Sequence, residues 1–135
     1  MQIDIGSVAL PFRTYAGTLQ GELMACQRYY ERVTSEGSNG FLGAGYNYAT
    51  TNAVIYMPFK VTKRVVPTAI DGGSSLEVQQ YSNASYAASS FAISTQSNTY
   101  IGAVTCTTAT ASANAASLLR GSSSTTAFIG FISEL

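Results

Sequence analysis

The fold class of this chain is decided by the stretch Ala53-Val-Ile-Tyr-Met-Pro-Phe-Lys-Val-Thr62. Every odd-numbered position in it is apolar, whereas the even positions include Pro58, Lys60 and Thr62. An apolar side chain at every second residue is typical of a β-strand with one buried face. Pro58 has no N–H to donate to a neighbouring strand, so it predicts a sheet edge or a bulge. We therefore expect a strand over residues 53–62.

Further runs toward the C-terminus carry related patterns. Side chains alternate at 76–79 and 91–95, and the run 100–108 is rich in β-branched and aromatic residues. Residues 127–133 are apolar at even and odd positions alike, as in a strand that is covered on both faces. Turn residues separate these runs, at 36–40, 71–74, 96–98 and 121–124. Such regular spacing of turns favours an all-β fold.

The expected architecture is a jelly-roll-like antiparallel β-sandwich. Only Leu19–Ala25 is compatible with a brief helix, with Thr18 as its cap and Gly21 as a weak point. We expect residues 1–18 to be an N-terminal connecting segment. Residues 19–135 are then a single sandwich domain, since a chain of this length supports one core.

Charged side chains are scarce. They make up 10% of the 135 residues, against about 25% in ordinary soluble domains, and seven basic residues balance seven acidic ones. Zero net charge without a basic stripe argues against a nucleic-acid partner. The absence of histidine excludes Ser-His-Asp and Cys-His catalysis and histidine-ligated metals, so we expect no cofactor. No apolar run is long enough to predict insertion into a membrane.

Two cysteines, Cys26 and Cys106, lie far apart in the sequence. A disulfide between them is one option. The option we favour is two buried free thiols that pack as small hydrophobic side chains, because neither belongs to a Cys-x-x-Cys motif.

The most distinctive stretch is Cys26-Gln27-Arg28-Tyr29-Tyr30-Glu31-Arg32. Its alternation predicts a strand in which Arg28, Tyr30 and Arg32 share one face with Cys26. Arginine beside tyrosine allows the guanidinium to stack on the ring, and Glu31 is expected to pair with an arginine of a neighbouring strand. We interpret this face as structural rather than ligand-binding.

Lys60, Lys63 and Arg64 form the one basic cluster of the sequence. Strand alternation would place Lys60 and Arg64 on one face and Lys63 on the other. A site for an anionic group is one interpretation. The interpretation we favour is a solvated strand edge whose charges keep it from pairing with other chains.

The stretch 26–32 resembles a module of tailed-bacteriophage virion proteins with the pattern Cys-Gln-Arg-Tyr-[Tyr/Phe]-[Glu/Gln]-[Lys/Arg]. A second motif of that module, Phe-x-Val-x-x-Arg-x-x-Pro-Thr, is similar to the segment from Phe59 to Pro67 and Thr68. The family often has Pro-Met where this chain has Thr62-Lys63. The resemblance covers about residues 20–70. It implies a β-sandwich at the distal end of a tail fibre or spike, located in the virion after assembly in the bacterial cytoplasm, and often a homotrimer.

The resulting expectation is a non-enzymatic virion module, a tail-fibre tip that binds a glycan or protein of the host surface. Tyrosine suits both sugar stacking and protein interfaces, so the candidate ligand-binding residues are Tyr46, Tyr48, Tyr81, Asn83 and Tyr86. The alternative for these tyrosines is a place in an interface between copies. A capsid decoration or head-fibre protein, in contact with other virion proteins, is the second function. A glycan depolymerase using Asp71 and Glu77 is the third.

The run 127–133 also predicts how copies would meet. A strand that is apolar on both faces marks an association site when it is exposed, and obligate interfaces are poor in charge. We therefore expect a homotrimer whose interface contains Phe128, Ile129, Phe131 and Ile132. The three-fold order is implied by the family resemblance alone.

Overall fold

The computed structural model describes residues 17–109 and 111–134. These residues form one helix and nine strands: α1 (Leu19–Gln27), β1 (Tyr30–Thr34), β2 (Phe41–Ala49), β3 (Asn52–Pro58), β4 (Ala69–Gly72), β5 (Leu76–Gln80), β6 (Ser85–Ile93), β7 (Ile101–Thr108), β8 (Ala116–Gly121) and β9 (Phe128–Ile132). All strand pairs are antiparallel. The prediction of an all-β fold is confirmed. Most of the predicted connecting segment, residues 1–16, lies outside the described residues.

Six strands close into a barrel in the order β2-β3-β7-β6-β5-β8. Closure occurs at β2, where Ala44 pairs with Tyr56 of β3 on one side and with Leu118 of β8 on the other. The predicted jelly-roll-like sandwich is therefore wrong, because one sheet closed on itself replaces two facing sheets. Among these six strands no edge remains for pairing with another chain.

The core of the barrel is built from the period-two runs. Ala53, Ile55 and Met57 on β3 are fully buried, at 0% exposure, as the alternation predicts. The strand ends at Pro58, beyond the last β2–β3 pair, so the proline lies where pairing on that side has stopped. The next residues, which we predicted to continue the strand to Thr62, are irregular.

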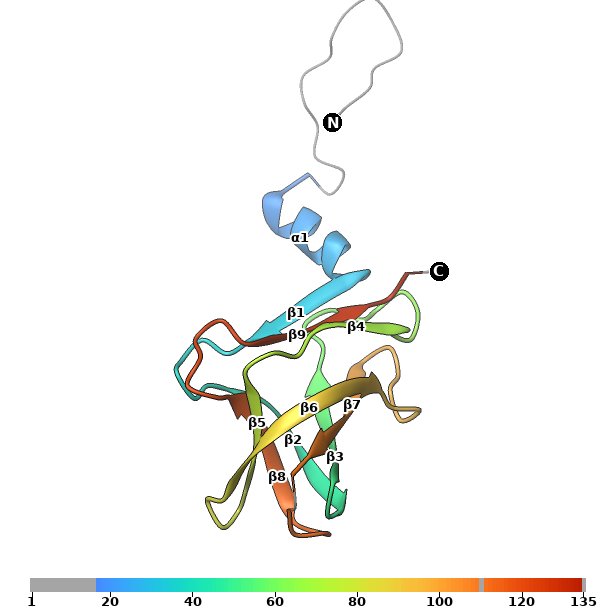
Figure 1. Cartoon of the computed structure of the whole chain (residues 1–135). Coiled ribbons are helices and arrows are strands. Elements are labelled where there is room, and N and C mark those ends of the chain that lie inside the picture. The colour runs from blue at the N-terminus through green and yellow to red at the C-terminus, as the bar shows by residue number, and fades with distance from the viewer. Residues whose placement is uncertain (1–16, 110, 135) are drawn as a thin grey trace, which may run out of the picture.

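The other three strands form a small sheet in the order β1-β9-β4, which we call the cap sheet. It lies across one end of the barrel (Figure 1). From its central strand β9, the fully buried Ile129 and Phe131 join the barrel core. The Phe131 ring meets Phe59 edge-to-face, with 5.0 Å between centroids. Gly102 on β7 permits this contact, because a Cβ there would lie 2.3 Å from the Phe131 ring.

This placement removes Ile129 and Phe131 from the interface that we predicted on β9. Ile129 and Phe131 are covered by the barrel of their own chain, so they cannot meet another copy. Phe128 and Ile132 point to the opposite side of the cap sheet and are half-buried. The guanidinium of Arg32 lies 3.5 Å from the centroid of the Phe128 ring. The two-sided apolar character of β9 thus reflects packing within one chain.

The segment Cys26–Arg32 is a helix end followed by a turn and a strand, which corrects the prediction of one continuous strand. Thr18 caps α1, accepting a hydrogen bond from Gly21 N at 3.1 Å, and the helix continues to Gln27, past the predicted Ala25. Strand β1 begins only at Tyr30. The Thr18 cap favours a helix start here, and no proline interrupts the residues that follow.

Two side-chain predictions for this region are also corrected. Glu31 pairs with Lys63 and not with an arginine. The distance from Lys63 Nζ to Glu31 Oε2 is 2.6 Å, and both side chains are buried. Lys63 is therefore not on a solvated edge. Cys26 is exposed and Cys106 is buried, so only one of the two predicted buried thiols is buried, while the prediction that both are free is confirmed.

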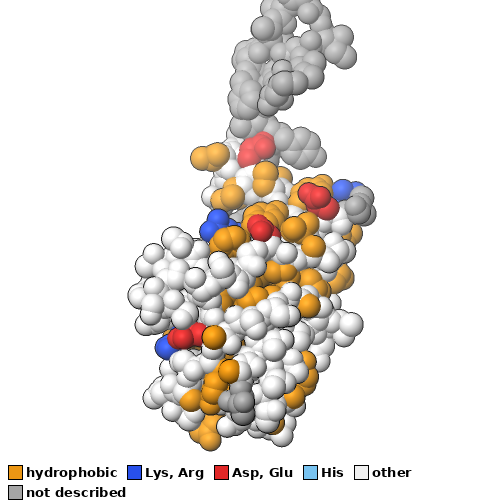
Figure 2. Space-filling view, in the orientation of Figure 1, with side chains coloured by type: hydrophobic (Ala, Val, Ile, Leu, Met, Phe, Trp, Pro, Cys, Tyr) orange, Lys and Arg blue, Asp and Glu red, His pale blue; other side chains and the backbone are white. Residues whose placement is uncertain are grey.

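Charged side chains are distributed unevenly between the barrel and the rest of the described molecule. The described barrel strands carry one acidic and one basic side chain, Glu77 and Arg120, which form an ion pair with 2.6 Å between Oε1 and Nε. The other charged residues that the structure describes lie in α1, the cap sheet, the segments that join them to the barrel and the C-terminal end. Figure 2 shows the blue and red side chains gathered near the cap sheet, with one pair on the barrel.

Candidate functional site

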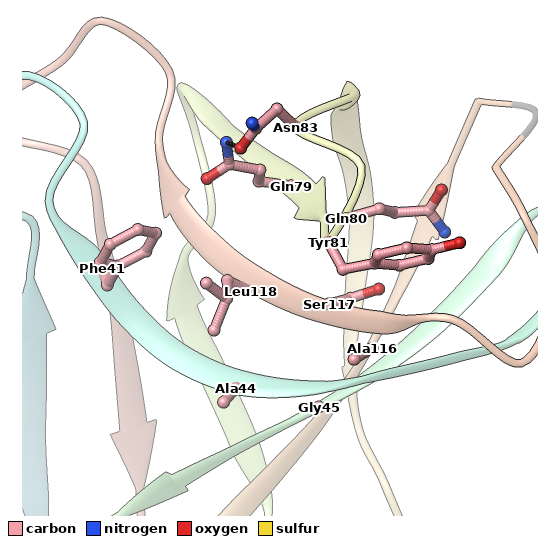
Figure 3. Close-up of a pocket in the computed structure, with 10 residues that line it drawn as sticks. All are labelled: Phe41, Ala44, Gly45, Gln79, Gln80, Tyr81, Asn83, Ala116, Ser117 and Leu118. Atoms are coloured by element: carbon pink, nitrogen blue, oxygen red, sulfur yellow. Dashed lines mark hydrogen bonds between the residues drawn. The ribbon is translucent and has the colours of Figure 1, made fainter.

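A groove of about 470 Å³ runs along the outside of the barrel over β2, β8 and β5. It is lined by Phe41, Ala44, Gly45, Gln79, Gln80, Tyr81, Asn83, Ala116, Ser117 and Leu118. Phe41 and Tyr81 lie at opposite ends, with Leu118 between them (Figure 3). We call this feature the amide groove, because two amide side chains, those of Gln79 and Asn83, form one of its walls.

Strand register explains why the surface is hollow here. Across the three strands, Ala44 lies opposite Leu118, which lies opposite Gln79. Ala116 and Leu118 are the outward residues of β8, while Ser117 and Leu119 point into the barrel. Small side chains on β2 and at Ala116 leave space that the larger side chains at the ends enclose.

The wall of the amide groove is ordered by Arg120. Its guanidinium donates to Glu77 at 2.6 Å, to Gln79 Oε1 at 3.1 Å and to Ser85 Oγ at 2.9 Å. With its oxygen occupied, Gln79 donates through Nε2 to Asn83 Oδ1 at 3.3 Å. The chain of hydrogen bonds therefore fixes which way both amides face, and it presents the Asn83 amino group as a donor.

The turn that carries Asn83 is itself well anchored. Asn83 adopts a left-handed backbone conformation, with φ of 62°, and its N–H donates to Gln80 O at 2.9 Å. Asparagine tolerates this conformation better than most residues. The Gln80 side chain is buried and makes two hydrogen bonds to the backbone of Ser112, at 2.8 and 3.2 Å. The β5–β6 turn is thus held against the loop before β8.

Electrostatically the groove is neutral. The phenol of Tyr81 is the single ionisable group among its lining residues. The nearest charges along β5 and β8, Glu77 and Arg120, pair with each other. Below the groove Ser117 donates to Asn47 inside the barrel, where the buried Asn47 Nδ2 and Thr108 Oγ1 have no hydrogen-bond partner among the described residues.

The predicted ligand-binding residues separate into three groups. Tyr81 and Asn83 line the amide groove. Tyr46 and Tyr48 line a different hollow, of about 350 Å³, over β2, β3 and β7. Tyr86 on β6 lines neither of these two hollows. Phe41, Gln79 and Leu118 could not be identified from the sequence, because three different strands bring them together.

The carboxylates proposed for a depolymerase have separate structural partners. Asp71 on β4 accepts a hydrogen bond from the Tyr30 hydroxyl at 3.0 Å, and Glu77 on β5 pairs with Arg120. Burial, followed by this hydrogen bond to Asp71, raises the pKa of Tyr30. The hydrogen bond of Asp71 and the ion pair of Glu77 are thus with different residues and not with each other.

A second surface that stands out is α1. None of its nine described residues is buried, and the exposed fractions of Leu19, Leu23 and Met24 are 85%, 49% and 48%. Leu19, Leu23 and the exposed Cys26 follow each other at steps of four and three residues, so they share one side of the helix, which we call the α1 seam. Figure 1 shows α1 extending away from the cap sheet.

The base of α1 is fixed to the domain by Lys63. Its ammonium group donates both to Glu31 and to the backbone oxygen of Gln27, the last residue of the helix. A cation at this end also interacts favourably with the helix dipole. The ammonium lies 4.5 Å from the centroid of the Phe59 ring. The direction of α1 is thus set by a buried group.

The described residues contain neither a candidate metal site nor a helix that could span a membrane. Within 17–109 and 111–134, no three His, Cys, Asp or Glu side chains gather in a way that could hold a metal ion. The one helix described there is too short to cross a bilayer.

The chain matches no model of a known protein family, no curated protein and no solved structure.

Proposed function

We propose that this chain is a non-enzymatic structural module of a bacteriophage virion, a tail-fibre tip that assembles as a homotrimer through α1 and presents its barrel to the host surface. The observation that carries this proposal is that α1 extends from the domain and buries none of its described side chains in it. The phage-like motifs at 26–32 and 59–68 supply the virion context.

The physical argument concerns the stability of α1. A helix of nine residues is not stable alone in water, because nucleation costs more than so few hydrogen bonds return. Most helices are stabilised by packing of an apolar face, whereas no residue of the α1 seam is buried in the described chain. Another surface must therefore cover the seam in the assembled protein.

A second copy of the chain is the occupant that fits best. Leu19, Leu23 and Cys26 have the alternating spacing of a coiled-coil seam, in which each apolar side chain packs against its equivalents. The chain has no net charge, so copies do not repel each other. The seam replaces β9 as the proposed interface, and three-fold order continues to come from the family resemblance.

This assembly places the barrel at the free end. Figure 1 shows the β2–β3 and β5–β6 hairpins at the end of the molecule opposite α1. The β5–β6 turn contains Tyr81 and Asn83 of the amide groove. With α1 joined to the axis of a fibre, the groove would face outward toward a host surface.

Light scattering of the purified protein tests the assembly. We expect a particle of three times the chain mass of 14.2 kDa. Leu23→Ser should dissociate it, while Met24→Ser is a matched control, because Met24 is equally exposed on α1 but lies off the seam. Circular dichroism should show both variants folded. A wild-type monomer, or equal dissociation by both variants, would contradict the proposal.

A capsid decoration or head-fibre protein is the second candidate. It is favoured by the apolar surface around the base of α1, where Tyr29, Tyr30 and Val66 are 42%, 39% and 44% exposed. Such a surface could seat the module on another virion protein. Copy number in purified particles separates the two functions, since decoration proteins are far more numerous than fibre tips.

A further inference from the structure

We infer that the amide groove binds an uncharged carbohydrate, whose ring stacks on Tyr81 and whose hydroxyl groups bond to the Gln79–Asn83 wall. This inference rests on the proposed function, for which it names the chemical class of the host ligand.

The aromatic side chains supply the first reason. Tyr81 is 81% exposed and Phe41 is 60% exposed, although burying either ring would be favourable. They stand at the two ends of the same groove (Figure 3). A rigid ring at the rim of a hollow suits the flat, C–H-rich face of a sugar, and the Tyr81 hydroxyl adds a polar contact.

The ordered amides supply the second reason. A sugar hydroxyl both donates and accepts hydrogen bonds, and an amide side chain does the same. Because Arg120 fixes Gln79 and Gln79 fixes Asn83, the wall is oriented before a ligand arrives. A preorganised polar group loses less conformational entropy on binding than a mobile one.

The charge of the groove selects the class of carbohydrate. The guanidinium of Arg120 is engaged by Glu77, Gln79 and Ser85, so it has little attraction left for an acidic sugar. Arg120 itself does not line the groove, and the side chains that do are neutral. An anionic glycan would lose its hydration without gaining a cation, whereas a neutral glycan has no such cost.

The closed sheet argues against the main alternative, an extended peptide. Peptides commonly add a strand to an exposed sheet edge. Strands β2, β8 and β5 are each paired on both sides, so the groove offers no such edge. The volume of about 470 Å³ lies within the range typical of small-ligand sites, roughly 300–1,000 Å³.

A printed array of neutral and anionic bacterial saccharides tests the inference, with the full-length protein as the probe. We expect binding to neutral saccharides only. Tyr81→Ala should weaken binding of the best neutral saccharide about ten-fold, the loss of one ring contact. Asn83→Asp, which keeps the turn but replaces the donor by a carboxylate, should also weaken it. Tyr100→Ala is the matched control: Tyr100 is 65% exposed and lies outside the groove, so binding should be unchanged.

Three results would overturn the inference: no binding to any neutral saccharide, preference for anionic saccharides, or equal effects of Tyr81→Ala and Tyr100→Ala. Light scattering on the same samples separates this failure from failure of the proposed function. A trimer that binds no neutral saccharide overturns the carbohydrate site and leaves the assembly. A monomer that binds neutral saccharides through Tyr81 confirms the site and overturns the assembly.

Discussion

The barrel and the cap end of this molecule, by which we mean α1 with the cap sheet, differ in how their sheet edges and apolar side chains are covered. The barrel closes its sheet, fills its interior with apolar side chains and carries a single ion pair. The cap end has open sheet edges at β1 and β4 and a helix none of whose described residues is buried, and most of the described charges lie in it or in the segments that join it to the barrel. A closed sheet can interact with other molecules only through its side chains, whereas the cap end offers backbone and an apolar seam.

The junction between these regions depends on a buried charge, which suggests the variant with the largest effect. Lys63→Ala should lower the free energy of unfolding by about 3–5 kcal/mol, because Glu31 would remain buried without a counter-ion. Chemical denaturation measures this. Lys60→Ala is the control, since Lys60 is exposed and uses its backbone N–H, which the variant keeps, to bond Glu31.

The double variant Glu31→Gln/Lys63→Met makes that measurement sharper. It removes both charges, so it should restore much of the stability that Lys63→Ala loses. If Lys63→Ala costs no more than Lys60→Ala, the cap end does not depend on this ion pair.

The packing of the cap sheet on the barrel gives a smaller expected effect. Gly102→Ala should cost about 1–3 kcal/mol, because the new methyl group would clash with the Phe131 ring. Gly37→Ala is the control, since the nearest atom to its Cβ would be 3.9 Å away. Thermal unfolding of the two variants compares them. Equal melting temperatures would show that β9 can move away from β7 at little cost.

The barrel was the more predictable region, and the reason is the range of the interactions. Alternation within 53–62 is a local property of the sequence, and it located the buried face of β3. Closure was not predictable, because it depends on pairing β2 with β8, whose residues are more than 60 positions apart in the chain. Whether such strands form one closed sheet or two facing sheets is settled by those distant pairs.

At the cap end the local pattern was misleading. Residues 26–32 alternate like a strand, but the capped helix that begins at Leu19 continues into them. Lys63 was expected in solvent, as most lysines are. It is instead buried, and its ammonium group bonds two groups that are distant in the sequence, Glu31 and the last carbonyl of α1. In the amide groove only Tyr81 and Asn83 were predictable, because they share one turn.

One cysteine lies in each region, Cys106 in the barrel and Cys26 in α1, so alkylation of the two thiols probes the regions separately. The difference in their rates of alkylation is the smallest effect that we expect. Burial raises the pKa of the Cys106 thiol to about 11, so this barrel residue stays protonated and unreactive in the folded protein. Cys26 belongs to the α1 seam and is exposed in the single chain. In the dissociated Leu23→Ser variant, iodoacetamide at pH 8 should therefore alkylate one cysteine, Cys26, and in the wild-type assembly it should alkylate that residue more slowly.

The pH dependence of Cys106 has a defined sign. Its folded pKa is above the ordinary value of 9.0, so the neutral thiol favours the folded state. This contribution to stability is complete below about pH 9 and is lost as the pH rises through about 11. Mass spectrometry after alkylation at increasing pH should show the second label only near that value or after unfolding. Labelling of Cys106 at pH 8 in the folded variant would mean that the barrel opens, whereas equal labelling of Cys26 in the variant and the wild type would mean that α1 has no partner.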